Sequence, residues 1–101
     1  MFRITDGKGF HITFPNGVTL STQFGGGNYC ANYDFKIGKE HAQDMISPDA
    51  EIAIWDKDHK WITETMEREL LPSEYYDSVM GRVNMDMWLK IFDWCRNWVA
   101  S

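Results

Sequence analysis

The sequence predicts an α+β fold, in which an antiparallel sheet of about four strands, made of two hairpins, packs against one short and one long C-terminal helix. Apolar and polar residues alternate over residues 10–24, as in two half-buried strands. Two more β-rich segments lie at 51–55 and 60–63, and helical periodicity follows over 85–99. The 101 residues provide one hydrophobic core, so a single domain over 1–101 is expected.

The first hairpin can be placed by its register. A two-residue turn would put the apolar residues of the two strands on opposite faces, because successive side chains alternate across a strand. A three-residue loop at 15–17 instead pairs Phe14 with Val18 and Ile12 with Leu20, on one face. The Pro-Asn-Gly sequence of that loop suits a type I turn followed by a left-handed glycine. We therefore predict the three-residue loop.

A polar strand face and a run of glycines form the predicted ligand site. The three glycines at 25–27 carry a large cost in backbone entropy, which usually marks unusual dihedral angles or a close approach. Amide groups freed in such a turn can form a nest for an anion, although no known phosphate-binding motif is present. The alternative is an ordinary solvated sheet face. The predicted ligand-binding residues are His11, Ser21, Gln23, Gly25, Gly26, Gly27, Asn28, Tyr29 and Tyr33.

The remaining elements follow from local signals. Residues 31–49 are irregular, with a short helix predicted near 39–46. A turn at 56–59 joins the two strands of the second hairpin, and residues 64–71 suit either a strand or a helix. A short helix is predicted over 73–80, after Pro72 and before Gly81, and a long helix from Met85 to about Val99 with Asn84 as its N-cap.

The long helix is apolar around most of its circumference. One sheet buries only one face of a helix, so a second apolar face needs another cover. Residues 64–81 could provide it, or a second copy of the chain or a partner protein could do so. The predicted interface residues are Met87, Ile91, Trp94 and Trp98.

Charge and cysteine usage exclude several classes of function. The chain has 15 acidic and 10 basic residues, a net charge of −5, which argues against direct binding to nucleic acid. Residues 40–77 alone carry eleven carboxylates against three cations. No apolar run is long enough for a membrane span, and the chain begins without a signal peptide, so a cytoplasmic protein with free thiols is expected. The His and Cys residues lack metal-site spacing, and no metal or other cofactor is predicted.

Two segments carry a resemblance. The run from Phe10 to Cys30 contains N-G-V-T-L-S-T-Q-F-G-G-G-N-Y-C, and the segment from Ala50 to Trp55 reads A-E-I-A-I-W. Both are similar to stretches in a family of small, mostly uncharacterised proteins of bacteriophages and related mobile elements. The resemblance covers about half the chain and implies a phage origin without an established reaction. By analogy, such proteins often act against host immunity.

Three functions are consistent with these features. The first is a non-catalytic, counter-defence binding protein that sequesters a small nucleotide-like ligand. The alternative is an inhibitor that blocks a host protein, through its acidic segment or the apolar helix. The third is a small enzyme that uses Cys30 as its nucleophile, although a lone cysteine is usually a buried small apolar residue.

Overall fold

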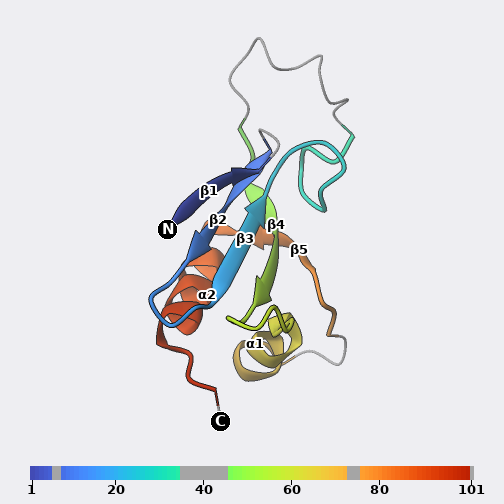
Figure 1. Cartoon of the computed structure of the whole chain (residues 1–101). Helices are drawn as coiled ribbons and strands as arrows, with labels where there is room; N and C mark the ends of the chain where they lie inside the picture. Colours follow the sequence, from blue (N-terminus) through green and yellow to red (C-terminus); the bar gives the residue numbers. More distant parts are fainter. Residues whose placement is uncertain (6–7, 35–45, 73–75, 101) are drawn as a thin grey trace.

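The computed structural model describes residues 1–5, 8–34, 46–72 and 76–100, which form one five-stranded antiparallel sheet and two helices (Figure 1). The α+β class is confirmed, with five strands where about four were predicted. The strands lie in the sheet in chain order. The elements are β1 (Phe2–Thr5), β2 (Gly9–Thr13), β3 (Thr19–Gln23), β4 (Asp49–Trp55), α1 (Thr63–Leu70), β5 (Met80–Asn84) and α2 (Met85–Asn97).

The predicted register of the first hairpin is confirmed. Ile12 lies opposite Leu20 in the β2–β3 ladder, and the Phe14 amide donates to the Val18 carbonyl at 2.9 Å. Gly17 has a φ of 86°, the left-handed conformation that the loop requires of its last residue. The apolar residues of both strands consequently share one face of the sheet.

The predicted helix over 73–80 is wrong in its described part. Residues 76–79 are irregular, and Met80 begins the edge strand β5, where Val83 pairs with Ala50 of β4. Burial of Val83 against the core decides this strand, because residues 80–84 carry no alternating apolar pattern of their own. Residues 73–75, and most of the helix predicted near 39–46, lie outside the described residues.

The prediction of a second hairpin is half correct. The turn at 56–59 forms, but the predicted return strand shrinks to a single bridge between Trp55 and Trp61. The Thr63 hydroxyl then accepts the Ile54 amide at 2.9 Å and so replaces the next rung of the ladder. The chain turns into α1, which settles the ambiguous segment 64–71 as a helix and makes it the short helix of the fold.

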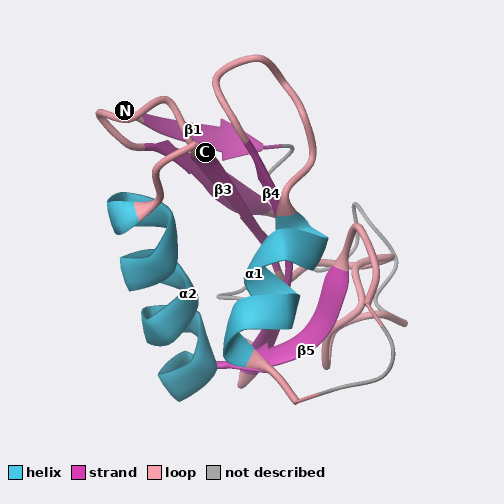
Figure 2. Cartoon of the chain, turned by 90° about the horizontal axis from the view of Figure 1, so that it is seen from below, coloured by secondary structure: helices cyan, strands magenta, loops and turns pink. Residues whose placement is uncertain are grey.

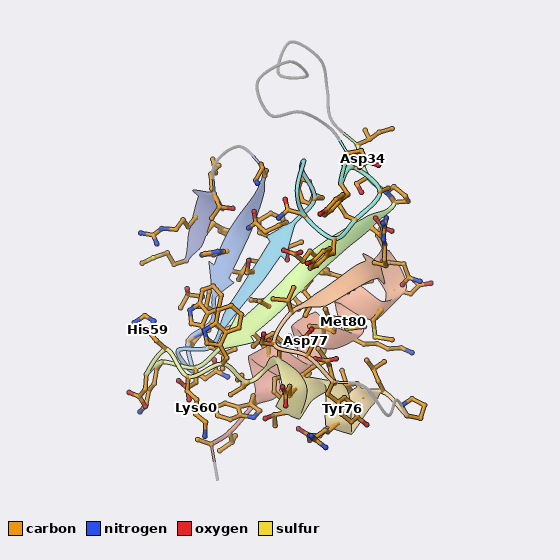
Figure 3. The ribbon with its side chains drawn as sticks, turned by 90° about the vertical axis from the view of Figure 1, so that its right-hand side faces the viewer. Asp34, His59, Lys60, Tyr76, Asp77 and Met80 are labelled. Carbon is orange, nitrogen blue, oxygen red and sulfur yellow. The ribbon has the colours of Figure 1, made fainter. Side chains whose placement is uncertain are left out.

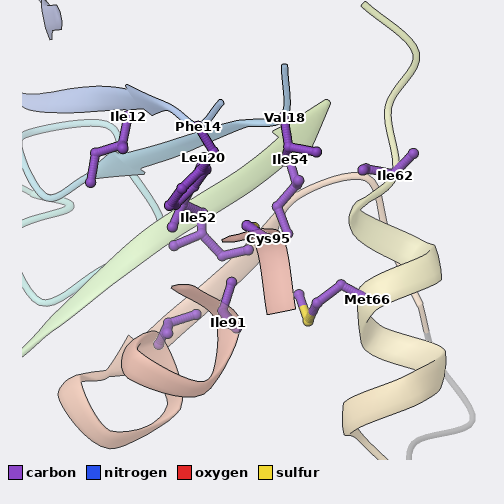
Figure 4. Close-up of a cluster of buried hydrophobic side chains, with 11 residues drawn as sticks. Ile12, Phe14, Val18, Leu20, Ile52, Ile54, Ile62, Met66, Ile91 and Cys95 are labelled. Atoms are coloured by element: carbon purple, nitrogen blue, oxygen red, sulfur yellow. The ribbon is translucent and has the colours of Figure 1, made fainter. Parts of the chain in front are cut away.

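Both helices cover the same face of the sheet (Figure 2). Met66 of α1 and Ile91 and Cys95 of α2 are fully buried against the strands, as the close-up in Figure 4 shows. The core cluster consists of Ile12, Phe14, Val18, Leu20, Ile52, Ile54, Ile62, Met66, Val83, Ile91 and Cys95. The opposite face of the sheet carries neither helix, and we call it the open face.

The long helix begins where predicted and ends two residues earlier. The Asn84 side chain accepts the Met87 amide at 2.9 Å, which is the N-cap interaction expected from the sequence. At the other end, the Asn16 amide group donates to the carbonyls of Cys95 at 2.9 Å and Trp98 at 3.0 Å. The hairpin tip is thereby attached to the C-terminal end of α2.

The predicted interface face of α2 is largely occupied within the chain. Ile91 is fully buried, and Met87, Trp94 and Trp98 are half-buried against the core. Trp94 also donates its indole N–H to Glu69 of α1 at 2.9 Å. Either residues 64–81 or a partner was expected to cover this face of the long helix. The helix α1, which lies largely within residues 64–81, provides that cover. No helix in the described part of the chain is long and apolar enough to cross a membrane.

Candidate functional site

The open face is built from the alternate residues of the strands whose other residues form the core. Arg3, His11, Ser21 and Ala53 lie side by side across β1 to β4. The next row toward the hairpin tip contains Thr13, Thr19 and Trp55. Because the period of a strand is two residues, burial of the apolar set fixes this polar set on the opposite side.

A hollow of about 620 Å³ lies on the open face beside the hairpin tip. It collects two permanent cations and two imidazoles around one carboxylate, so its formal charge is positive although the chain as a whole is acidic. His59 lies at this end of the sheet in Figure 3, where α2 is seen behind the strands. The lining residues are Met1, Arg3, His11, Thr13, Gly17, Thr19, Trp55, Asp56, Lys57 and His59.

The carboxylate of the hollow, Asp56, organises the turn that supplies two of the basic residues. It accepts the amides of Asp58 and Lys60, both at 2.9 Å. This turn holds His59 at a φ of 63°, a conformation that is uncommon for a residue other than glycine and is often found at functional sites. Lys57 and His59 are thus placed on the wall of the hollow opposite Arg3 by a compact turn rather than by a regular strand.

Aromatic rings form the second part of the site. The ring of His11 meets that of Trp55 edge to face, with centroids 5.0 Å apart. Trp61 lies 5.5 Å from Trp55, and 52% of its surface is exposed. An exposed tryptophan ring beside a half-buried one, next to cations, suits a planar ligand group that carries negative charge nearby.

The imidazole of His11 is tuned toward its neutral form. Burial lowers its pKa from the ordinary value of 6.5, and the positive charge of Arg3 lowers the pKa further. Both effects favour the neutral form of the ring. An anion bound beside Arg3 would offset the positive charge of Arg3 and favour protonation of His11.

The middle of the open face satisfies its own hydrogen bonds. Gln23 donates from Nε2 to Thr5 at 2.7 Å and lies 3.4 Å from the Ser21 hydroxyl. Ser21 is buried, so its hydroxyl is part of the floor of the sheet rather than an exposed contact. Of the three strand residues predicted to bind a ligand, only His11 lines the hollow.

The glycine turn already contains an anion, the protein's own Glu51. This carboxylate accepts the Tyr29 amide at 2.9 Å and the Asn28 side chain at 3.3 Å. The amides of Gly25 and Gly27 donate to Asn28 Oδ1 and to the Tyr33 carbonyl. The nest predicted for a ligand phosphate is therefore largely filled from within the chain.

The rest of the glycine turn is closely packed against neighbouring residues. A Cβ on Gly81 of β5 would lie 2.7 Å from the Cβ of Tyr29, so the turn rests directly on the edge strand. The rings of Tyr29 and Tyr33 are stacked with centroids 5.8 Å apart and are about half exposed. Neither ring lines the hollow, and the predicted ligand residues thus fall into two separate places.

The cysteines are poorly placed for nucleophilic chemistry. Cys30 and Cys95 are both fully buried, and burial raises the pKa of Cys95 to about 12. The sulfur of Cys30 faces the Gly25 carbonyl at 3.7 Å. The described residues contain no group of three His, Cys, Asp or Glu side chains that could hold a metal ion.

Most residues of the hollow were not identified from the sequence. Arg3, Lys57, His59 and Trp55, and Trp61 beside the hollow, come from segments to which no role in a site was assigned. One signal was present: Trp55 alternates with Ile52 and Ile54, which places it opposite the core. The pairing of β3 with β4, which brings Trp55 beside Thr19 and near His11, was not predictable from that alternation.

Comparison with known proteins identifies no matching family model, no matching curated protein and no matching solved structure. The resemblance to small phage proteins therefore stays a prediction.

Proposed function

We propose that this chain is a non-catalytic binding protein that captures a small anionic ligand with an aromatic ring, of the nucleotide type, in the hollow of the open face. The observation that carries the proposal is the combination of Arg3, Lys57 and two imidazoles with half-buried Trp55 and its exposed neighbour Trp61.

Each group has a defined part in recognition. The guanidinium of Arg3 can bind two phosphate oxygens at once, and Lys57 adds a point charge from the opposite wall. Trp55 and Trp61 offer faces on which a base can stack, an interaction worth about 1–3 kcal/mol per base. The ligand is thus recognised at both ends, by charge and by ring.

A binding role fits the chemistry of the hollow better than catalysis. Its two threonine hydroxyls, on Thr13 and Thr19, hydrogen-bond to each other at 2.9 Å. The ring of His11 packs against the ring of Trp55 rather than against either threonine hydroxyl. Capture without turnover agrees with the counter-defence role that the phage resemblance implies, in which a signalling nucleotide is sequestered.

The proposal is tested by ligand identification followed by matched variants. The purified protein is denatured and the supernatant analysed by mass spectrometry, and a panel of mononucleotides, cyclic dinucleotides and ADP-ribose derivatives is titrated while tryptophan fluorescence is followed. Arg3→Gln and Lys57→Gln should each weaken binding roughly tenfold, as expected for the loss of a charge-assisted contact. Arg96→Gln is the matched control, since Arg96 is exposed, does not line the hollow and pairs with its helix neighbour Asp93 at 3.1 Å.

Two results would contradict this function. One is an empty supernatant together with no binding across the panel. The other is binding that Arg3→Gln and Arg96→Gln weaken equally, because the ligand would then respond to net charge and not to the hollow.

The alternative, an inhibitor of a host protein, is favoured by a different observation. An apolar hollow of about 300 Å³ lies on the helix-covered side, with Met85 and Leu89 of α2 on its wall. These two side chains are 76% and 54% exposed, as expected for a surface that a partner covers. A host protein that copurifies with the wild type and is lost with Leu89→Asp, but not with Lys90→Asp, would support this reading.

A further inference from the structure

The edge strand β1 has unused backbone groups and two exposed apolar side chains. In the described sheet, β1 pairs on one side only, with β2 (Figure 1). Residue 1 and Thr13 exchange both backbone hydrogen bonds, at 2.8 and 2.9 Å. Because such pairs alternate along an antiparallel ladder, the N–H and C=O groups of Phe2 and Ile4 point away from β2.

The side chains of the same two residues are exposed. They lie opposite Ile12 and Phe10, on the face of the sheet that the helices cover. Phe2 is 80% exposed and Ile4 is 83% exposed. An edge strand with free backbone groups and large apolar side chains is a template for another strand.

We infer that this edge pairs with β1 of a second copy of the chain, antiparallel about a two-fold axis at Arg3. In that register Phe2 of each copy faces Ile4 of the other, so all four outward backbone groups of each strand find partners. The edge is therefore complementary to itself, as an isologous dimer requires.

The second copy would also complete the proposed ligand site. Arg3 lines the hollow from the edge strand, so the hollow borders the point where the second sheet begins. Pairing about Arg3 places the two guanidinium groups side by side on the open face, where like charges oppose association. An anion bound between them removes that opposition, so anion binding and dimer formation favour each other. This part of the inference rests on the proposed function.

The test is the oligomeric state of the full chain, measured by light scattering and analytical ultracentrifugation over a wide concentration range, with and without millimolar inorganic phosphate. The mass should rise with concentration from 11.8 kDa toward twice that value. The edge is short, so a weak dimer is expected. Phosphate should tighten it roughly two- to fivefold, the range that corresponds to one pair of like charges.

Substitutions identify the surface. Ile4→Pro removes an outward N–H without touching the β1–β2 ladder and should abolish the dimer. Ile4→Lys should do the same if the proline variant fails to fold, and Leu89→Lys is the control, since it adds the same charge to an exposed apolar position of α2. Arg3→Gln should tighten the dimer and make it insensitive to phosphate.

Three results would overturn the inference: a monomer at all concentrations with and without phosphate, assembly beyond two copies, or a dimer that Ile4→Lys spares and Leu89→Lys disrupts. A monomer that still binds nucleotides through Arg3 would leave the proposed function intact. A dimer without nucleotide binding would remove the proposed function and leave the edge pairing.

Discussion

The two faces of the sheet are made by the same strands and have opposite properties. On β3, Leu20 enters the core and is fully buried, while its neighbours Thr19 and Ser21 belong to the open face. On β4, Ile54 packs under the helices, and the next residue, Trp55, lines the hollow. The covered face thus provides the hydrophobic stabilisation, and the open face provides charge, aromatic surface and a concave shape.

This division means that stability and recognition should be separable by mutation. A substitution on the covered face should change the free energy of unfolding and leave the ligand affinity of the folded protein unchanged. A substitution on the open face should change the ligand affinity and leave the free energy of unfolding nearly unchanged. Each prediction below tests the division at one position.

The largest effect is expected in the centre of the covered face. Leu20→Ala removes a fully buried side chain from the cluster and should lower the free energy of unfolding by about 2–5 kcal/mol. Urea denaturation monitored by circular dichroism measures this. Thr65→Ala on the exposed side of α1 is the control and should stay within about 0.5 kcal/mol of the wild type. A small decrease in the free energy of unfolding for Leu20→Ala would show that the covered face contributes little to stability.

The next largest effect concerns the join between the hairpin tip and α2. Asn16→Ala removes the hydrogen bonds to Cys95 and Trp98 and the acceptor for the Val18 amide. Unfolding should become easier by about 1–3 kcal/mol. Asn97→Ala is the matched control, because Asn97 makes one exposed hydrogen bond within the helix, to Asp93. Equal losses in the two variants would mean that the tip is not anchored in solution.

On the open face the expected change is in affinity rather than stability. Trp61→Ala removes an exposed ring and should shift the free energy of unfolding by no more than about 0.5 kcal/mol. Its affinity for the ligand identified from the panel should fall roughly tenfold. Isothermal titration calorimetry and urea denaturation of the same samples compare the two effects. If stability falls while affinity is unchanged, the tryptophan pair belongs to the packing and not to the site.

The smallest effect is the pH dependence contributed by His11. Its folded pKa is below 6.5, so the unfolded chain binds more protons between that lowered pKa and 6.5. The stabilisation is fully present above 6.5 and is lost as the pH falls through the folded pKa. His11→Gln should flatten this part of the stability profile. A direct check is the NMR titration of the His11 ring, and a pKa above 6.5 would contradict the prediction.

The elements that the sequence predicted correctly are those with complete local signals. The loop at 15–17 was predictable because only one loop length puts Ile12 and Leu20 on the same face. The start of α2 was predictable because Asn84 is a strong capping residue before a helical pattern. For β5 and α1 the local signals were weak or misleading. Pro72 and Gly81 suggested helix boundaries, but burial of Val83 beside Ala50 made the segment from Met80 a strand.

The residues of the candidate site were even harder to predict from local sequence signals. The sequence pointed to the glycine turn because three glycines are conspicuous, and it also named His11, which lies on the polar face and lines the hollow. It could not show that Glu51, from a strand 22 residues away, occupies the turn. Nor could it show that Lys57 and His59 lie across the hollow from Arg3.

By itself, therefore, the sequence determined the fold class, the register of the hairpin and the existence of a polar face behind it. These depend on periodicity and turn chemistry, which act over a few residues. Only the tertiary structure decided which segments border that face, because strand pairing across β3 and β4 and burial under two helices join residues far apart in the chain. The hairpin supplied the platform, and long-range pairing placed the cations and tryptophans around it.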